Sequence, residues 1–177
     1  VLVVATGAET LVPDIPGSGG SRVAGAEEVL TGRKAVRGTV IVIGGGMVGC
    51  ETAEFLLERA KGVTRVIVLE MMDRMAQNVS PTYRPFFLAR LKKMGVELET
   101  GTTVTEITGD GIKVLRKGSP GFVAADSVVL AAGYRADPSK TAAFRNAAPE
   151  VYAVGDCAGA RMIKDAIEEG FHTGRSL

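Results

Sequence analysis

The sequence predicts an α/β fold with a mostly parallel sheet. Apolar runs of strand length alternate with helical patterns through the middle of the chain, in the order strand, helix, strand, helix, strand, hairpin, strand. Glycine is unusually frequent, with 23 in 177 residues, roughly twice the usual share. These glycines gather where strands end, at Gly7, Gly44 to Gly49, Gly133 and Gly155. Their placement indicates a backbone that turns sharply beside something it must approach closely.

The first elements follow from apolar runs and breakers. Residues 1–5 are uniformly apolar, as expected of a strand covered on both faces. Residues 13–20 are rich in Gly, Pro and Ser and predict a loop. A short helix is expected over 26–30 and a second buried strand over 39–43. A buried strand such as 1–5 is an unusual place for a chain to begin. Together with the lack of an initiator Met and of a basic leader, it predicts a fragment of a longer polypeptide.

The middle elements alternate in type. A helix is expected over 47–61, because its apolar residues recur on one face, and a strand over 65–70. Ser80 and Pro81 are typical of the N-cap and first position of a helix, which would run to Gly95, although Pro85 removes a donor from its second turn. A short strand over 96–100 follows.

The remaining elements complete the sheet and open a second unit. Residues 103–108 and 112–115 flank Gly109-Asp110-Gly111 and predict a hairpin. Strands are expected over 126–131 and 151–154, and a helix over 162–174. The α/β layer is therefore expected over 33–135. The segments 1–32 and 136–177 are expected to form parts of a second unit, joined through space.

Composition excludes several classes of protein. Hydrophobic residues make up 46% and charged residues 23%, which are globular proportions. A net charge of +1 gives no support to nucleic-acid binding. No apolar run approaches the roughly 20 residues that span a bilayer, so no membrane association is expected, and the expected compartment is the cytoplasm. The sequence leaves open whether the protein forms a homo-oligomer.

The strongest motif is G-x-G-x-x-G, placed directly after a predicted strand and opening a predicted helix. Gly44 permits the tight turn, Gly46 lets the backbone approach a pyrophosphate, and Gly49 lets helix and strand pack closely. The helix N-terminus offers N–H groups and a positive dipole end to phosphates. The motif predicts a dinucleotide site in a Rossmann-like domain, whose backbone contacts run through Gly45, Met47 and Val48. The alternative is a tight turn that binds nothing.

An acidic residue ends the next predicted strand. Glu70 follows Gly44 by 26 positions, near the offset of roughly 20 expected of a carboxylate that binds the ribose hydroxyls. It would repel a 2′-phosphate, so NAD(H) is favoured over NADP(H). Met71 is expected beside it. Arg74 is near enough in the sequence to suggest binding of a 2′-phosphate instead, but Glu70 occupies the position expected of the ribose-binding carboxylate.

Two further strand ends carry weaker signals. Ala132 and Gly133 end an apolar strand, and we expect both beside the nucleotide. Gly155 and Asp156 end another, where a carboxylate could accept a hydrogen bond from a sugar-like hydroxyl. Neither pair is specific by itself.

Together these residues resemble the pyridine-nucleotide oxidoreductase superfamily, the flavoproteins with two dinucleotide-binding domains. The chain is most similar to the NADH:flavin oxidoreductases of the 2-enoate reductase and 2,4-dienoyl-CoA reductase group. The segments that carry the resemblance are VIVIGGGMVGCETAEFLL at 40–57, ADSVVLAAGYR at 125–135 and VYAVGDCAGARMIKDAIEEGFHTG at 151–174. One departure is the loop 135–138, Arg-Ala-Asp-Pro, where the family usually has Arg-Pro.

The resemblance implies a division of labour. Residues 33–135 would be the NAD(H)-binding domain, and 1–32 with 136–177 would be parts of an FAD-binding domain, with Asp156 near the ribityl chain of FAD. The first glycine fingerprint for FAD, a barrel with FMN and a 4Fe–4S cluster would belong to a missing N-terminal part. The implied activity is hydride transfer from NADH to FAD, ultimately to reduce an activated alkene. No residue of this chain would be a catalytic acid, base or metal ligand.

Three interpretations stay open. The chain is the NADH-binding part of such an enzyme, or the adenine-nucleotide-binding part of an amine-dehydrogenase-like flavoprotein that does not use NADH, or a catalytically silent NAD-binding module. The two cysteines do not decide between them. Cys50 opens a helix, where a thiol pKa can fall, but no C-x-x-C pattern is present. Buried, small and unreactive cysteines are the expectation for both Cys50 and Cys157.

Overall fold

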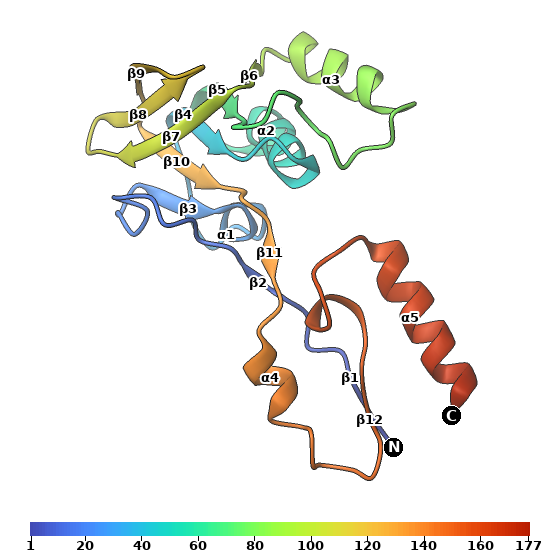
Figure 1. Cartoon of the computed structure of the whole chain (residues 1–177). Helices are drawn as coiled ribbons and strands as arrows, with labels where there is room; N and C mark the ends of the chain where they lie inside the picture. Colours follow the sequence, from blue (N-terminus) through green and yellow to red (C-terminus); the bar gives the residue numbers. More distant parts are fainter. The chain divides into compact units, whose positions relative to one another are not determined.

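The computed structural model describes all 177 residues and divides into two compact units (Figure 1). One unit is Val12–Gly133, and the other combines Val1–Leu11 with Tyr134–Leu177. This moves the expected boundary, because residues 12–32 belong to the α/β unit and not to the flanking one. The reason is that β3 (Val23–Gly25) pairs with the central sheet and that Ala26 and Val29 of α1 (Ala26–Leu30) are buried in its core.

The central sheet of the unit Val12–Gly133 is parallel, as the sequence predicts, and has five strands, of which β3 was not expected. Their spatial order is β3-β10-β4-β5-β6. The new members are β10 (Ser127–Leu130), β4 (Gly38–Ile43), β5 (Val63–Leu69) and β6 (Glu97–Glu99). After β4 the chain adds β5 and β6 on one side and then returns to add β10 on the other side. Between β4 and β10 the strand order reverses, and in open α/β sheets ligands bind at the carboxyl ends of the strands beside such a reversal.

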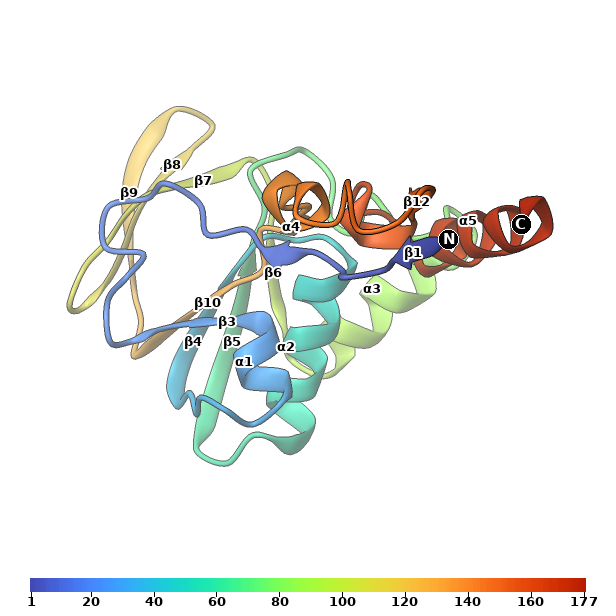
Figure 2. The same cartoon turned by 90° about the horizontal axis from the view of Figure 1, so that it is seen from below.

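The two faces of this sheet carry different layers (Figure 2). Helices α1, α2 (Met47–Arg59) and α3 (Arg84–Lys93) cover one face, and an antiparallel sheet of three strands covers the other. That sheet consists of β7 (Thr102–Ile107), β8 (Gly111–Arg116) and β9 (Ser119–Ala124). Alternate residues of β4 therefore enter separate cores, with Val40 and Val42 toward the helices and Ile41 and Ile43 toward the antiparallel sheet.

Two elements of this unit differ from the expectation. The hairpin has a third strand, β9, joined to β8 by a turn in which Lys117 and Gly118 both have positive φ. Helix α3 begins at Arg84 and not at Ser80. The carbonyl of Ser80 instead accepts hydrogen bonds from the amides of Tyr83 and Arg84, which closes a separate turn before the helix.

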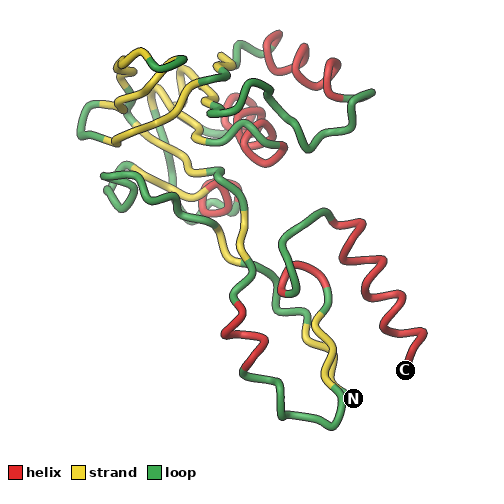
Figure 3. The backbone as a smooth tube through the Cα atoms, viewed as in Figure 1, coloured by secondary structure: helices red, strands yellow, loops and turns green.

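The other unit has short strands, long loops and one long helix, α5 (Ile163–Ser176) (Figure 3). Its strands form two pairs, a parallel pair of β1 (Leu2–Val4) with β12 (Val151–Ala153) and an antiparallel pair of β2 (Glu9–Thr10) with β11 (Tyr134–Arg135). Its helices are α4 (Pro138–Ala142), the 3₁₀ turn η1 (Gly155–Cys157) and α5 (Ile163–Ser176).

The first strand is less buried than its apolar sequence suggests. Val4 is buried, but Val3 is 44% exposed, so the expectation of a strand covered on both faces is wrong for β1. Within this chain, β1 pairs only with β12. None of the helices is both long and apolar enough to cross a bilayer.

Candidate functional site

The glycine motif forms the turn from β4 into α2, and two of its glycines are required by the fold. Gly44 has φ +110°, and a Cβ there would lie 2.4 Å from the carbonyl oxygen of Ala131. A Cβ on Gly49 would lie 1.9 Å from the carbonyl oxygen of Gly44. Backbone atoms cannot yield at such distances, so the close approach of α2 to β4 and β10 excludes any side chain at these two positions.

Gly46 is different, because nothing in the fold forbids a side chain there. Its φ of −69° is open to any residue, and the nearest atom to an added methyl group would be Oδ1 of Asn78 at 3.6 Å, an ordinary contact. The glycine at the N-cap of α2 therefore leaves free space next to the first amides of the helix. A helix of this length offers a positive dipole end and unpaired N–H groups at that point.

Glu70 follows β5 and holds the glycine turn by hydrogen bonds that sequence reasoning missed. Its Oε2 accepts from the Gly45 amide at 2.8 Å, and its Oε1 accepts from the Met72 amide at 2.9 Å. Gly45 is also crowded, since a Cβ would lie 2.2 Å from Sδ of Met75. The carboxylate is half-buried, so it can fix the turn and still face a ligand with its remaining lone pairs.

Asn78 is a second residue that the sequence did not reveal. Its Oδ1 accepts a hydrogen bond from the Met47 amide at 2.8 Å and so caps α2. The loop that carries it is fixed to the glycine turn by the Ala76 amide, which donates to the Gly45 carbonyl at 2.6 Å. Asn78 lies 31 residues from Met47 in the sequence, and no local pattern announces a cap from so far away.

These residues surround a cavity of about 470 Å³ at the carboxyl edge of the sheet. Six of the thirteen residues expected to bind a cofactor line it, namely Gly44, Gly46, Glu70, Met71, Ala132 and Gly133. Its other walls come from β7 and from Pro13 and Ile15. The cavity lies at the reversal of strand order between β4 and β10, and its volume is in the range of small-molecule sites.

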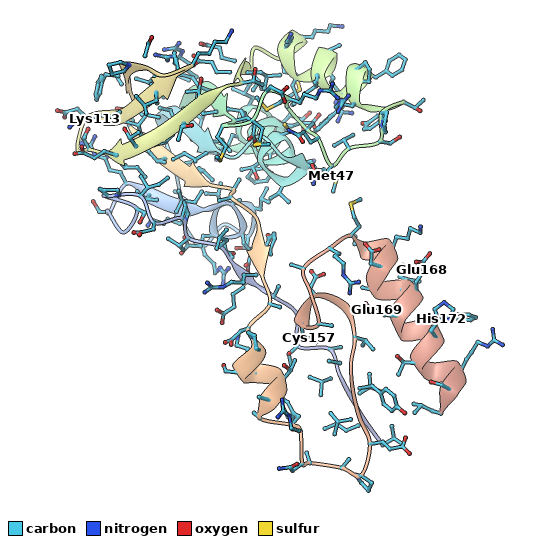
Figure 4. The ribbon with its side chains drawn as sticks, viewed as in Figure 1. Met47, Lys113, Cys157, Glu168, Glu169 and His172 are labelled. Carbon is cyan, nitrogen blue, oxygen red and sulfur yellow. The ribbon has the colours of Figure 1, made fainter.

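The other expected residues of this unit take different places. Arg74 lines a smaller neighbouring hollow of about 240 Å³ together with Gly46, Glu70 and Asn78. Met47 and Val48 form the first turn of α2 and are half-buried (Figure 4 labels Met47). Of these, Met47 has its amide already bonded to Asn78.

Gly155 and Asp156 belong to the other unit, in a loop held by α5. The Gly155 amide donates to Oε2 of Glu169 at 2.7 Å, and Glu169 also pairs with Arg161. Oδ1 of Asp156 accepts from the Arg161 amide at 3.1 Å. Figure 4 labels Glu169 on α5 and Cys157 on this loop. A hollow of about 400 Å³ next to the loop is lined by Gly155, Asp156 and Arg161, together with Ala5, Gly7, Val154, Ile163, Ala166 and Ile167.

Both cysteines are buried free thiols. Burial, with smaller contributions from the charges of Glu70 and Glu51, raises the pKa of Cys50 from 9.0 to about 12. The helix N-terminus therefore does not activate this thiol, and Cys50 donates to the Gly45 carbonyl at 3.6 Å. Cys157 lies 3.2 Å from the carbonyl oxygens of Val4 and Val154. The interpretation of two small packed side chains is supported for both.

Known proteins of one family share this sequence pattern. The family model described as pyridine nucleotide-disulphide oxidoreductase matches residues 1–170. A bilirubin reductase of Mediterraneibacter gnavus is 39% identical over 171 residues, which are 96% of this chain and 26% of that protein. A cinnamate reductase of Clostridium sporogenes is 28% identical over 179 residues, 99% of this chain and 26% of that protein.

A solved structure has a similar fold over nearly the whole chain. A 2-naphthoyl-CoA reductase in complex with 2-naphthoyl-CoA superimposes with a TM-score of 0.92 and 31% identity, over 99% of this chain and 26% of that one. The chain thus spans about a quarter of the length of these relatives.

Proposed function

Because this chain belongs to the pyridine nucleotide-disulphide oxidoreductase family, we propose that it is the NADH-binding, and in part FAD-binding, region of an NADH-dependent flavin oxidoreductase. The unit Val12–Gly133 binds NADH in this proposal, and the unit of Val1–Leu11 with Tyr134–Leu177 contributes to an FAD site. Both cysteines are free thiols, which accords with the reducing cytoplasm as the compartment.

One observation carries the proposal. Gly46 is the glycine of the motif that the fold does not need, and it borders the open space at the start of α2. Gly44, Gly45 and Gly49 are all accounted for by clashes that a Cβ would cause. A glycine without an internal reason, at a helix N-terminus and in the wall of a cavity, is explained by the close approach of a pyrophosphate.

The residues of the cavity have distinct tasks in this proposal. The amides at the start of α2 bind the pyrophosphate, and Gly46 gives it room. Glu70 accepts hydrogen bonds from the ribose hydroxyls while it holds the Gly45 amide. Ala132 and Gly133 at the end of β10 leave the backbone open beside the remainder of the dinucleotide. NADH, when bound, supplies a hydride, and these residues orient it.

The same carboxylate favours NADH over NADPH. A 2′-phosphate placed near Glu70 would meet a negative charge that is fixed by two backbone amides and cannot easily turn away. Arg74 lies in the hollow next to Glu70 and is the residue that could offset this repulsion. We give Glu70 the greater weight because it also lines the main cavity.

The rest of the reaction belongs to the longer protein. Gly155 and Asp156 fit a contact with the sugar-like chain of FAD, because the Asp156 carboxylate lines a hollow of about 400 Å³ next to a positive-φ glycine. FMN, a 4Fe–4S cluster and the first FAD-binding segment are proposed for the part outside this chain. The proposed final substrate is an activated alkene, which accords with a relative named for cinnamate, an acid with a conjugated double bond.

Two alternatives make different predictions. An amine-dehydrogenase-like protein would bind an adenine nucleotide at this cavity without using NADH, and an amine oxidase with 27% identity and a TM-score of 0.83 keeps that alternative in view. A silent module would bind NADH and reduce nothing.

Titration of NADH and NADPH fluorescence with the purified chain tests the proposal, and ADP serves as the competitor. Tighter binding of NADH than of NADPH or ADP supports a working NADH site, whereas ADP binding without NADH binding supports the amine-dehydrogenase-like alternative. An absorbance spectrum before and after addition of FAD then measures how much of the flavin site this chain holds. We expect a colourless chain with weak FAD binding and background turnover of NADH.

A further inference from the structure

A cleft of about 410 Å³ lies at the edge of the central sheet opposite the glycine motif. Its walls include residues one or two positions before the parallel strands: Arg22 before β3, Arg37 before β4, Lys61 before β5 and Asp126 before β10. Because the strands are parallel, their amino ends meet at one edge, and the segments that enter them bring these side chains together. The cleft lies entirely within the unit Val12–Gly133.

Positive charge is concentrated in this cleft. Arg22, Lys34, Arg37 and Lys61 carry four cations against the single carboxylate of Asp126, whereas the whole chain has a net charge of only +1. None of the four is within 4 Å of a carboxylate oxygen, although eight other basic side chains of this chain form ion pairs. Four cations facing one cleft repel each other unless an anion joins them.

The single carboxylate is directed toward the backbone. Oδ2 of Asp126 accepts a hydrogen bond from the Thr39 amide at 2.8 Å. A Cβ on Gly38 would lie 2.2 Å from the same oxygen, so the carboxylate is packed against the start of β4. It stabilises the entry into the strand and forms no ion pair with the four cations.

Hydrogen bonds to buried or backbone groups hold the residues around the cleft in place. The backbone amide and carbonyl of Arg37 each form a 3.1 Å hydrogen bond with Oγ of Ser127, which is buried. Lys34 is half-buried, and its ammonium donates to the carbonyl of Val23. That bond uses one of its three protons and holds the charge in place, with two donors remaining.

We propose that this cleft binds a small molecule that carries a diphosphate or two neighbouring phosphate groups. Arginine and lysine are the side chains that bind phosphate oxygens best, and the volume exceeds what a single phosphate fills. A nucleic acid would need basic charge that extends over a wider surface, which the near-neutral chain does not supply. The site is separate from the cavity at Gly46, so it does not depend on the proposed function.

Isothermal titration with inorganic pyrophosphate at low ionic strength tests the proposal. The test variant is the double substitution Arg37→Gln with Lys61→Gln, since both side chains are exposed and neither forms an ion pair. The control is Lys92→Gln with Lys93→Gln on α3, which removes the same charge from exposed positions outside the cleft. We expect binding at least about tenfold weaker in the test variant and within about twofold of the unmodified chain in the control.

A second variant separates this cleft from the glycine motif, which could also bind pyrophosphate. Gly46→Val blocks the start of α2 and should leave pyrophosphate binding at the cleft intact, whether or not the chain binds NADH. Equal weakening by the test and control variants, or loss of all pyrophosphate binding in Gly46→Val, would overturn the proposal. Circular dichroism checks folding, and the single substitution Lys61→Gln replaces the double variant if that one unfolds.

Discussion

Glu70 and Gly45 are joined by a hydrogen bond of 2.8 Å from the Gly45 amide to Oε2 of the carboxylate. The residue expected to recognise the ribose therefore also supports the glycine turn. In the proposed NADH site, this one side chain would couple binding of the adenosine end to binding of the pyrophosphate, so a substitution at Glu70 should change both.

The substitution Glu70→Gln tests this coupling. It removes the negative charge and places an amide NH₂ group near one of two backbone donors, so one of the hydrogen bonds to Gly45 or Met72 is lost. We expect NADH affinity to fall about tenfold, as for the loss of a hydrogen bond to a charged group. NADPH affinity should fall less, because the repulsion of its 2′-phosphate is removed as well. Fluorescence titration measures both constants.

Glu58→Gln on the exposed end of α2 is the matched control. It removes the same charge without touching the cavity and should leave both affinities unchanged. An unaltered ratio of NADH to NADPH affinity in Glu70→Gln would show that this carboxylate does not select the nucleotide.

Gly46→Ala and Gly44→Ala should separate binding from folding. Gly46→Ala has room for its methyl group and should lose no more than about 1 kcal/mol of unfolding free energy, the cost of alanine at an N-cap. It should weaken NADH binding at least about tenfold, because the methyl group fills the space of the pyrophosphate. Gly44→Ala meets Ala131 at 2.4 Å with a positive φ and should lose about 2 kcal/mol or more. Urea unfolding and fluorescence titration give the two quantities.

Gly19→Ala is the control for these variants, because it lies in open space away from the motif. Wild-type NADH affinity in Gly46→Ala would reduce the glycine motif to a structural turn. A Gly44→Ala chain of unchanged stability would contradict the crowded geometry at the end of β10.

The raised pKa of Cys50 predicts how stability depends on alkaline pH. The folded thiol keeps its proton up to a pH of about 12, whereas the unfolded thiol loses it near 9.0. The unfolded state is therefore favoured as pH rises between these values, and stability falls by about 1.4 kcal/mol per pH unit on account of this group. Below pH 9 the contribution is constant.

Urea unfolding of the unmodified chain and of Cys50→Ala from pH 7 to 10 measures this effect. The variant should start less stable, because a buried side chain is shortened, and should show a flatter decline above pH 9. Parallel curves of stability against pH would contradict the raised pKa of Cys50.

Burial of both thiols also predicts their reactivity. In the folded chain at pH 7, a thiol reagent should modify neither cysteine within minutes, and it should modify both after unfolding.

Glu169 should control the loop of Gly155 and Asp156. Its hydrogen bonds with Arg161 and with the Gly155 amide lower the pKa of this carboxyl below 4.5, so they are complete above that pH and are lost as the solution becomes more acidic. The Gly155 amide resonance should shift on acidification below pH 4.5. Glu169→Gln should shift it already at pH 7, whereas Glu168→Gln on the preceding position of α5 should not. An unchanged resonance in Glu169→Gln would contradict the contact.

The sequence predicted the parts of the fold that depend on local periodicity. The strands around Ile41 and Ile67 are long, apolar and flanked by glycine, and the helix from Met47 has one apolar face, so their types and approximate limits were right. The third strand of the antiparallel sheet was missed because Pro120 and Gly121 are poor strand residues. Pairing with β8 compensates for them.

The site divides in the same way. The tight turn at Gly44 and the position of Glu70 after β5 follow from the order of strand, turn and helix, which local sequence encodes, whereas the hydrogen bond from Glu70 to the turn does not. Asn78 and Glu169 act across 31 and 14 residues, through loops whose paths depend on the packing of the finished fold. The boundary at Val12 was missed for the same reason, since β3 joins the sheet only through β10, about a hundred residues later.

The pairing of β2 with β11 also determines how readily the unit Val12–Gly133 can be removed or exchanged. Thr10 is the partner of Tyr134, so the backbone leaves for the unit Val12–Gly133 and comes back from it at two adjacent points, about 5 Å apart for paired strand residues. A segment whose two ends are neighbours can be removed or exchanged without stretching what remains. The unit Val12–Gly133 can therefore be deleted as a whole, and a short turn from Thr10 to Tyr134 would reconnect the chain.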